Sequence, residues 1–126
     1  MNRVRLGRRA EAYVSLYYQR KFGFDLLSQN LRLGACEIDL LMKKGTAMRM
    51  IEVRSSSTRN NDDLAWSLVG KKARSLRKSI HALIQRGIMD TDQEFQVDAA
   101  LVRWSNTGPP SLKLWFNIFP GDLGSL

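Results

Sequence analysis

Apolar residues recur at helical spacing near the start of the chain. One stripe runs through the segment from Arg8 to Lys21 and predicts an amphipathic helix. The stripe consists of Leu6, Ala10, Tyr13, Val14 and Tyr17. Gly23 stands where such a helix is expected to end. Glu11 falls at the edge of the stripe, so this acid is expected near the packed face of the helix rather than in solvent.

The pattern then changes to the alternation that is typical of strands. Residues 25–32 predict a first strand, and residues 36–42 alternate as a second. One face of the second strand is expected to carry Cys36, Ile38, Leu40 and Met42. The other face is expected to carry Glu37, Asp39 and Leu41.

A short turn joins this strand to the next. Residues 43–46 are a turn signal, and residues 48–54 predict a third strand. So short a connection predicts an antiparallel hairpin. If the turn is centred between Gly45 and Thr46, Asp39 lies opposite Glu52, with both side chains on one face of the sheet.

The second half of the chain adds a helix and two strands. Residues 55–63 are polar and predict a flexible loop, and a helix is expected from Ala65 or Gly70 to Arg86, with Gly87 as its C-terminal cap. Two further strands are expected at residues 95–104 and 112–119. The order α-β-β-β-α-β-β predicts a mixed α/β (α+β) domain, in which helices flank a central sheet.

Length and composition narrow the class of protein. The 126 residues, 44% of them hydrophobic, fit a single globular domain over residues 1–126, with a core at about 7–119 and a flexible tail at 120–126. The one cysteine, Cys36, excludes an internal disulfide and a zinc site made of several thiolates. No apolar run suits a membrane span or a signal peptide, so we expect no membrane partner and a cytoplasmic location.

The charge points to a polyanionic partner. Lys and Arg total 20 against 12 Asp and Glu, which gives a net charge of +8, and such an excess favours nucleic acid as the partner. The second predicted helix presents a basic row made of Lys71, Lys72, Arg74, Arg77 and Lys78. A face of one sign favours phosphate contact, and the alternative is a merely solvated helix face.

Two acids stand among apolar strand residues, where acids are costly. Asp39 and Glu52 would repel each other across the hairpin unless a cation lay between them. Mg²⁺ or Mn²⁺ is the expected cation, because hard divalent ions take oxygen ligands and can activate water. Glu37 and Glu11 are further candidate acids. The alternative is that Asp39 or Glu52 simply pairs with a nearby base, for which the candidates are Arg49, Arg54 and Lys44.

These residues also resemble a known family. Glu37-Ile38-Asp39, followed by Ile51-Glu52-Val53-Arg54, is similar to the Asp…Glu-x-Lys core of the PD-(D/E)XK nucleases. The flanking segments at 7–12, 71–72 and 95–98 narrow the resemblance to the bacterial YraN-like family. It covers residues 7–104 and implies a restriction-endonuclease-like fold, similar to that of archaeal Holliday-junction resolvases.

The resemblance implies roles for individual residues. Asp39 and Glu52 would be the metal ligands, and Glu11 would be the helical acid that completes the catalytic site. Arg54 stands where a catalytic lysine is expected, and arginine stays protonated and presents a different donor geometry. Two smaller departures are Ser56, where a basic residue is usual, and Cys36, where glycine is usual.

Three functional hypotheses follow. The first is a Mg²⁺-dependent endonuclease that acts on DNA, including branched DNA. The second, favoured by Arg54, is a catalytically impaired nucleic-acid-binding module on the same fold. The third is an adaptor whose basic face meets an acidic protein. Resolvase-like folds often work as dimers, so the resemblance also raises a homodimer.

Overall fold

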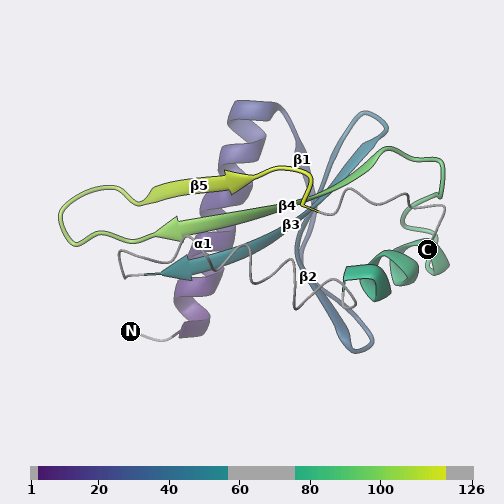
Figure 1. The fold of residues 1–126 in the computed structure, drawn as a ribbon, viewed down its shortest axis with the longest axis horizontal. Coiled ribbons are helices and arrows are strands. Elements are labelled where there is room, and N and C mark those ends of the chain that lie inside the picture. The colour runs from purple at the N-terminus through teal and green to yellow at the C-terminus, as the bar shows by residue number, and fades with distance from the viewer. Residues whose placement is uncertain (1–2, 57–75, 119–126) are drawn as a thin grey trace.

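The computed structural model describes residues 3–56 and 76–118. Helix α1 spans Arg3–Tyr17 and continues into a π-helical turn, η1, at Tyr18–Phe22 (Figure 1). The strands are β1 at Asp25–Leu33, β2 at Cys36–Lys44, β3 at Ala47–Ser56, β4 at Phe95–Arg103 and β5 at Ser111–Trp115. A second helix occupies residues 76–85, and no helix of the described segments is long and apolar enough to cross a membrane.

The five strands form one mixed sheet in the order β1-β2-β3-β4-β5. All neighbours are antiparallel except β3 and β4, which run parallel. Parallel neighbours need a crossover connection, and residues 57–94 supply it, with the 76–85 helix inside. The predicted α-β-β-β-α-β-β order and the mixed α/β fold class are therefore confirmed.

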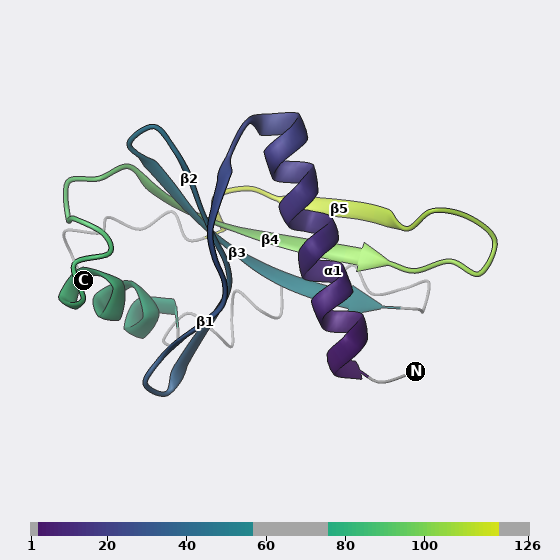
Figure 2. The same cartoon turned by 180° about the vertical axis from the view of Figure 1, so that it is seen from behind.

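The two helices pack with two separate core clusters. The first helix contributes Ala10, Val14 and Tyr18 to a cluster that also contains Leu40 and Ile51. Figure 2 shows α1 lying across the strands on this side. The 76–85 helix contributes to the other cluster through Leu76, Ile80 and Leu83. Asp39 and Glu52 each adjoin a strand residue of the first cluster, Leu40 and Ile51 respectively.

The hairpin register is confirmed as far as it is formed. The pairs run from Lys44 with Ala47 to Leu40 with Ile51, which is the register that the turn at Gly45 predicts. The ladder ends there, one step before Asp39 and Glu52 would face each other.

One expectation for β2 is wrong. Ile38 packs with Leu41 in the cluster of the 76–85 helix, whereas Leu40 and Met42 pack in the cluster of α1. The simple alternation therefore breaks around Asp39. On the neighbouring strand the residue at this point is Asn30, whose φ of 55° is left-handed and interrupts regular strand geometry.

The first helix starts earlier than predicted and ends at Gly23 as predicted. It begins at Arg3 rather than Arg8, and its last turn widens into η1 before Gly23 ends it with a φ of 74°. Tyr13 and Tyr17 are only half-buried, and the fully buried tyrosine is Tyr18. Tyr18 follows Val14 by four residues and so continues the packed stripe.

The later boundaries agree with the predicted cap at Gly87 and differ at one strand. Gly87 has a φ of 72° just after the 76–85 helix, as a C-terminal cap requires. Strand β5 ends at Trp115 rather than 119, because Asn117 turns with a φ of 55° and its N–H bonds to Asp98. The predicted start of the second helix and the tail at 120–126 lie outside the described residues.

Candidate functional site

Glu11 is a buried acid on the inner side of α1. Its Oε1 accepts a long hydrogen bond of 3.5 Å from Gln29 Nε2 on β1. Burial raises the pKa of Glu11 above its ordinary value, and the negative charge of Asp39 raises it further, with a smaller contribution from Glu37. Hydrogen bonds from the side chains of Asn30 and Gln29 act in the opposite direction. The sequence expectation that Glu11 faces inward is thus confirmed.

Asp39 joins β2 to β3 beyond the end of their ladder. Its Oδ2 accepts a hydrogen bond of 2.9 Å from the backbone N–H of Val53. This side-chain contact takes the place of the next backbone pair, which the ladder lacks. Asp39 is half-buried, and its charge reaches Glu11 across the sheet. The structure therefore brings together acids from α1 and β2 that lie 28 positions apart in the sequence.

Glu52 lies directly before Val53 and is only 4% exposed. Strand alternation places its side chain with Met50, which packs in the cluster of the 76–85 helix. Glu11, by contrast, belongs to the helix over the opposite face. Asp39 stands between them, where β2 leaves β3. The face-to-face pair of Asp39 and Glu52 expected from the hairpin is absent from the ladder, and both acids instead flank its end.

The basic residues near these acids are mostly engaged elsewhere. Arg49 pairs with Asp98 at 3.5 Å and lies over the Phe24 ring, and Lys44 Nζ donates to the Phe22 carbonyl at 2.7 Å. These contacts direct Arg49 and Lys44 towards partners other than the acids of the candidate site. Arg54 is exposed and forms no ion pair with a described residue.

Glu37 lies at the edge of this group of acids. It forms an ion pair of 3.5 Å with Arg32, and both side chains are substantially exposed. Such surface pairs contribute little to stability. Glu37 adds negative charge near Glu11 but is not itself enclosed.

The acids of this site have the right chemistry to bind a metal ion, but they do not form a complete set of ligands. Carboxylate oxygens suit Mg²⁺ or Mn²⁺, and a cation would relieve the repulsion between Glu11 and Asp39. Within residues 3–56 and 76–118, however, no three His, Cys, Asp or Glu side chains gather closely enough to hold a metal ion.

Only part of the basic row can be placed. Arg77 and Lys78 are exposed on the 76–85 helix, whose other side carries Leu76 and Ile80 into the core. The remaining members, Lys71, Lys72 and Arg74, lie outside the described residues.

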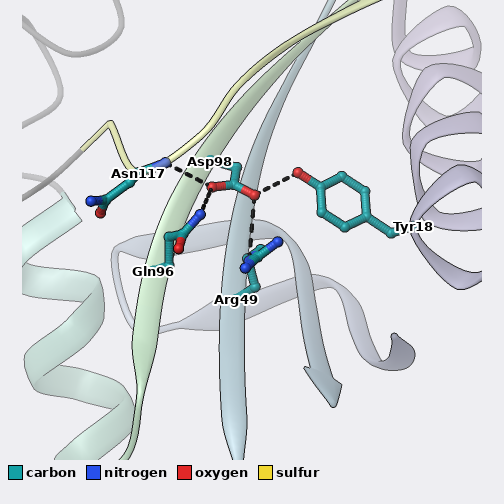
Figure 3. A network of polar contacts seen from close by, with 5 residues as sticks. All are labelled: Tyr18, Arg49, Gln96, Asp98 and Asn117. Carbon is teal, nitrogen blue, oxygen red and sulfur yellow. Dashed lines mark hydrogen bonds and ion pairs between the residues drawn. The ribbon is translucent and has the colours of Figure 1, made fainter. Parts of the chain in front are cut away.

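A buried polar network was missed by sequence reasoning. Asp98, fully buried on β4, accepts hydrogen bonds from the Tyr18 hydroxyl at 2.6 Å, Gln96 Nε2 at 2.8 Å and the Asn117 N–H at 2.9 Å (Figure 3). Arg49 Nε approaches the same carboxylate at 3.5 Å. The pKa of Tyr18 is raised, first by burial and then by the charge of Asp98.

This network fastens four parts of the chain together. It links η1, β3 and the turn after β5 to strand β4. The available signal was an acid inside the apolar run from Val97 to Val102. An acid in such a run requires partners, because an unpaired buried charge is very costly.

Comparison with known proteins identifies the family. Residues 10–102 match the family described as "Uncharacterised protein family UPF0102". A UPF0102 protein of Herminiimonas arsenicoxydans is 32% identical over 93 residues, covering 71% of this chain and 75% of the relative. A UPF0102 protein of Parvibaculum lavamentivorans is 30% identical over 103 residues, covering 79% of this chain and 75% of the relative.

One solved structure is also similar in shape. The structure of Pyrococcus furiosus SfsA in complex with Ca²⁺ matches with a TM-score of 0.41 and 9% identity. The match covers 83% of this chain and 62% of that one, which is less than two thirds of its length. The family match over residues 10–102 and the two relatives together show that this chain belongs to the UPF0102 family, the YraN-like family that its motifs resemble.

Proposed function

We propose that this protein is a divalent-metal-dependent endonuclease-like protein that acts on DNA. The observation that carries the proposal is the convergence of Glu11 and Asp39. These acids come from different elements, and the negative charge of Asp39, which lies just beyond the end of the β2–β3 ladder, raises the pKa of Glu11. Buried acids that repel one another are typical of sites that bind a cation or transfer protons.

Within this proposal each acid has a distinct task. Asp39 and Glu52 hold Mg²⁺ or Mn²⁺, and Glu11 completes the site from α1. The Val53 N–H donates to Oδ2 of Asp39 and so fixes the orientation of this carboxylate. A divalent ion bound there supplies activation of water and stabilisation of charge on the phosphoryl group.

The substrate is held by positive charge. Arg54 is exposed two residues after Glu52, where it can donate to a phosphate oxygen. The basic row at residues 71–78 contacts the DNA backbone further away, and the net charge of +8 supports a polyanionic partner. Symmetric cutting of a four-way junction would need two such sites, so for this substrate the working unit is a homodimer.

The test is cleavage with matched variants. Linear, single-stranded and four-way-junction DNA are incubated with the protein in Mg²⁺, in Mn²⁺ and in EDTA. We expect metal-dependent products that Asp39→Ala abolishes, while circular dichroism shows that the variant still folds. Asp90→Ala removes an exposed acid remote from the site and serves as the control. Cleavage that survives Asp39→Ala or EDTA would contradict the proposal.

A second candidate function rests on Arg54. Arginine at this position supports a module that binds nucleic acid without cutting it, because a guanidinium cannot act as a base and does not superimpose on an ammonium. In that case wild-type protein binds DNA in EDTA and cuts in no metal, and Arg54→Lys is the informative variant. Cleavage that appears only in Arg54→Lys would establish that the wild-type protein is a binding module and that it lacks cleavage because position 54 is not a lysine.

A further inference from the structure

A hollow lies on the outer side of α1 and η1, and the chemistry of its lining differs from that of the acidic site. Its lining consists of Tyr13, Leu16, Tyr17, Arg20 and Lys21, and its volume is about 360 Å³. The first four of these residues follow helical spacing and so form one stripe on the helix surface. Leu16 is 46% exposed, so the hollow presents an apolar side chain to solvent beside its two tyrosines.

Aromatic rings continue from this hollow towards the end of the sheet. The Tyr17 ring meets Phe22 edge-to-face at 5.7 Å, and Phe22 meets Phe116 in the same way at 5.9 Å. Phe22 is fixed further by Tyr18, at 5.2 Å, and by Lys44, which binds its carbonyl. Phe116 at the end of the row is 51% exposed. Contacts with Tyr18 and Lys44 thus hold Phe22 in place, and the Phe116 ring at the end of the row is accessible from solvent.

The backbone at this point is irregular. Residues 18–22 form a π-helical turn rather than continuing α1, and such turns occur frequently at functional sites. The widened turn brings Phe22 into contact with Tyr17, five positions away, and leaves Arg20 and Lys21 exposed.

The charge around the rings is of one sign. Arg20 and Lys21 line the hollow, and no acid does. Neither cation forms an ion pair with a described residue. Rings beside unpaired cations suit a ligand that combines flat apolar groups with regularly spaced negative charges.

We propose that this surface, the ring row of Tyr17, Phe22 and Phe116 together with Arg20 and Lys21, binds single-stranded nucleic acid. Unpaired bases stack on the rings, and the two cations contact the phosphates. Stacking tolerates any base, because every base presents a π-face, whereas bases within a duplex are already stacked and do not reach the rings. Binding here therefore favours an unpaired strand over a duplex.

The proposal rests on the proposed function and makes it more specific. Tyr17 and Glu11 share α1, six residues apart, which corresponds to a rise of about 9 Å. A strand held on the rings would therefore lie within a few nucleotides of the acids. The substrate would then be a DNA that contains an unpaired segment, such as a branch point or a flap.

The experiment measures binding without cleavage. A fluorescently labelled oligothymidylate is titrated with the full-length protein in EDTA and followed by anisotropy, beside an abasic strand of equal length and charge and a duplex of the same length. We expect the oligothymidylate to bind about tenfold more tightly than the abasic strand, as a stacked base implies. Because EDTA prevents any metal-dependent cleavage, failure of cleavage and failure of strand binding are separate results.

Matched variants assign the surface. Phe116→Ala removes an exposed ring and should abolish most of the preference over the abasic strand, while Leu27→Ala, an exposed apolar side chain on β1, should not. Arg20→Gln should weaken binding of both strands and lower the salt slope by about 0.7. Arg86→Gln removes the same charge after the 76–85 helix, outside this surface, and should leave both the salt slope and the preference nearly unchanged.

Three results would overturn the proposal. Equal binding of abasic and oligothymidylate strands would exclude stacking on the rings. An unchanged preference in Phe116→Ala together with Tyr17→Ala would place stacking elsewhere. Stronger competition by an acidic peptide than by the unlabelled oligothymidylate would make the surface a protein-docking site.

Discussion

Two buried carboxylates, Asp98 and Glu11, have opposite electrostatic surroundings in this protein. Asp98 on β4 receives hydrogen bonds from the Tyr18 hydroxyl, the Gln96 amide and the Asn117 backbone, and an ion pair from Arg49. Glu11 on α1 has two amide side chains for partners and two negative charges for neighbours. The carboxylate of Asp98 is therefore stabilised by its donors, whereas the charge of Glu11 is repelled by nearby negative charges.

This contrast distinguishes the structural role of Asp98 from the functional role proposed for Glu11. A carboxylate with donors on both oxygens has no capacity left for a ligand, so Asp98 fixes the elements around it and does little else. A buried acid that faces other acids costs stability, and natural proteins keep such costs mainly where function requires them. The hydrogen bond between Tyr18 and Asp98 also holds the end of the helix that carries Glu11. The Asp98 network therefore helps to position the acids of the candidate site.

Removing Asp98 should have the largest effect on stability. Asp98→Ala leaves Arg49 as a buried charge without its partner and frees the donors of Tyr18 and Gln96. We expect the free energy of unfolding to fall by about 3–5 kcal/mol, as for one-sided loss of a buried ion pair. Urea denaturation measures this loss. Asp92→Ala, at an exposed acid, is the control, and a loss below about 1 kcal/mol for Asp98→Ala would show that the network is not a scaffold.

Removing one hydroxyl should have an intermediate effect. Tyr18→Phe deletes the donor that lies 2.6 Å from Asp98 and keeps the ring contacts with Phe22 and Phe24. A hydrogen bond to a charged group contributes about 1.5–3 kcal/mol, so the stability should fall by that amount. Tyr17→Phe changes a half-buried tyrosine next to it and should be near neutral in the same denaturation experiment. Equal effects of the two variants would contradict the special role of Tyr18.

The sequence was most informative where interactions are local. Alternation and a short turn predict the β2–β3 hairpin and its register, because a turn at Gly45 determines which residues can pair. The inward position of Glu11 follows from helical periodicity alone.

Long-range contacts were not accessible in this way. Tyr18 and Asp98 are separated by 80 positions, and no local pattern joins them. The break in alternation at Asp39 also depends on the neighbouring strand, where Asn30 takes a left-handed conformation. The acids of the site could therefore be named from the sequence, but their distribution between the two faces of the sheet could not.

Neutralising Glu11 should stabilise the protein. Glu11→Gln keeps the shape of the side chain and its amide neighbours but removes a buried charge that Asp39 and Glu37 oppose. We expect a gain of about 1 kcal/mol in the free energy of unfolding at pH 7, the size usual for relief of such a functional cost. Divalent cations should narrow this gain, because only the wild-type acid assists in binding them. A loss of stability in Glu11→Gln would contradict the comparison with Asp98.

The pH dependence gives the smallest and most specific effect. The pKa of Glu11 is raised by folding from its ordinary value of 4.5, so between these two pKa values the folded protein binds more protons than the unfolded chain. Wild-type stability therefore decreases as the pH rises from about 4.5 to the raised pKa, relative to Glu11→Gln, which cannot titrate there. The two proteins should be closely similar at pH 4 and diverge up to a plateau near neutrality, as measured by urea denaturation at each pH. A difference that is already complete at pH 4 would mean that packing, and not the charge of Glu11, separates the two proteins.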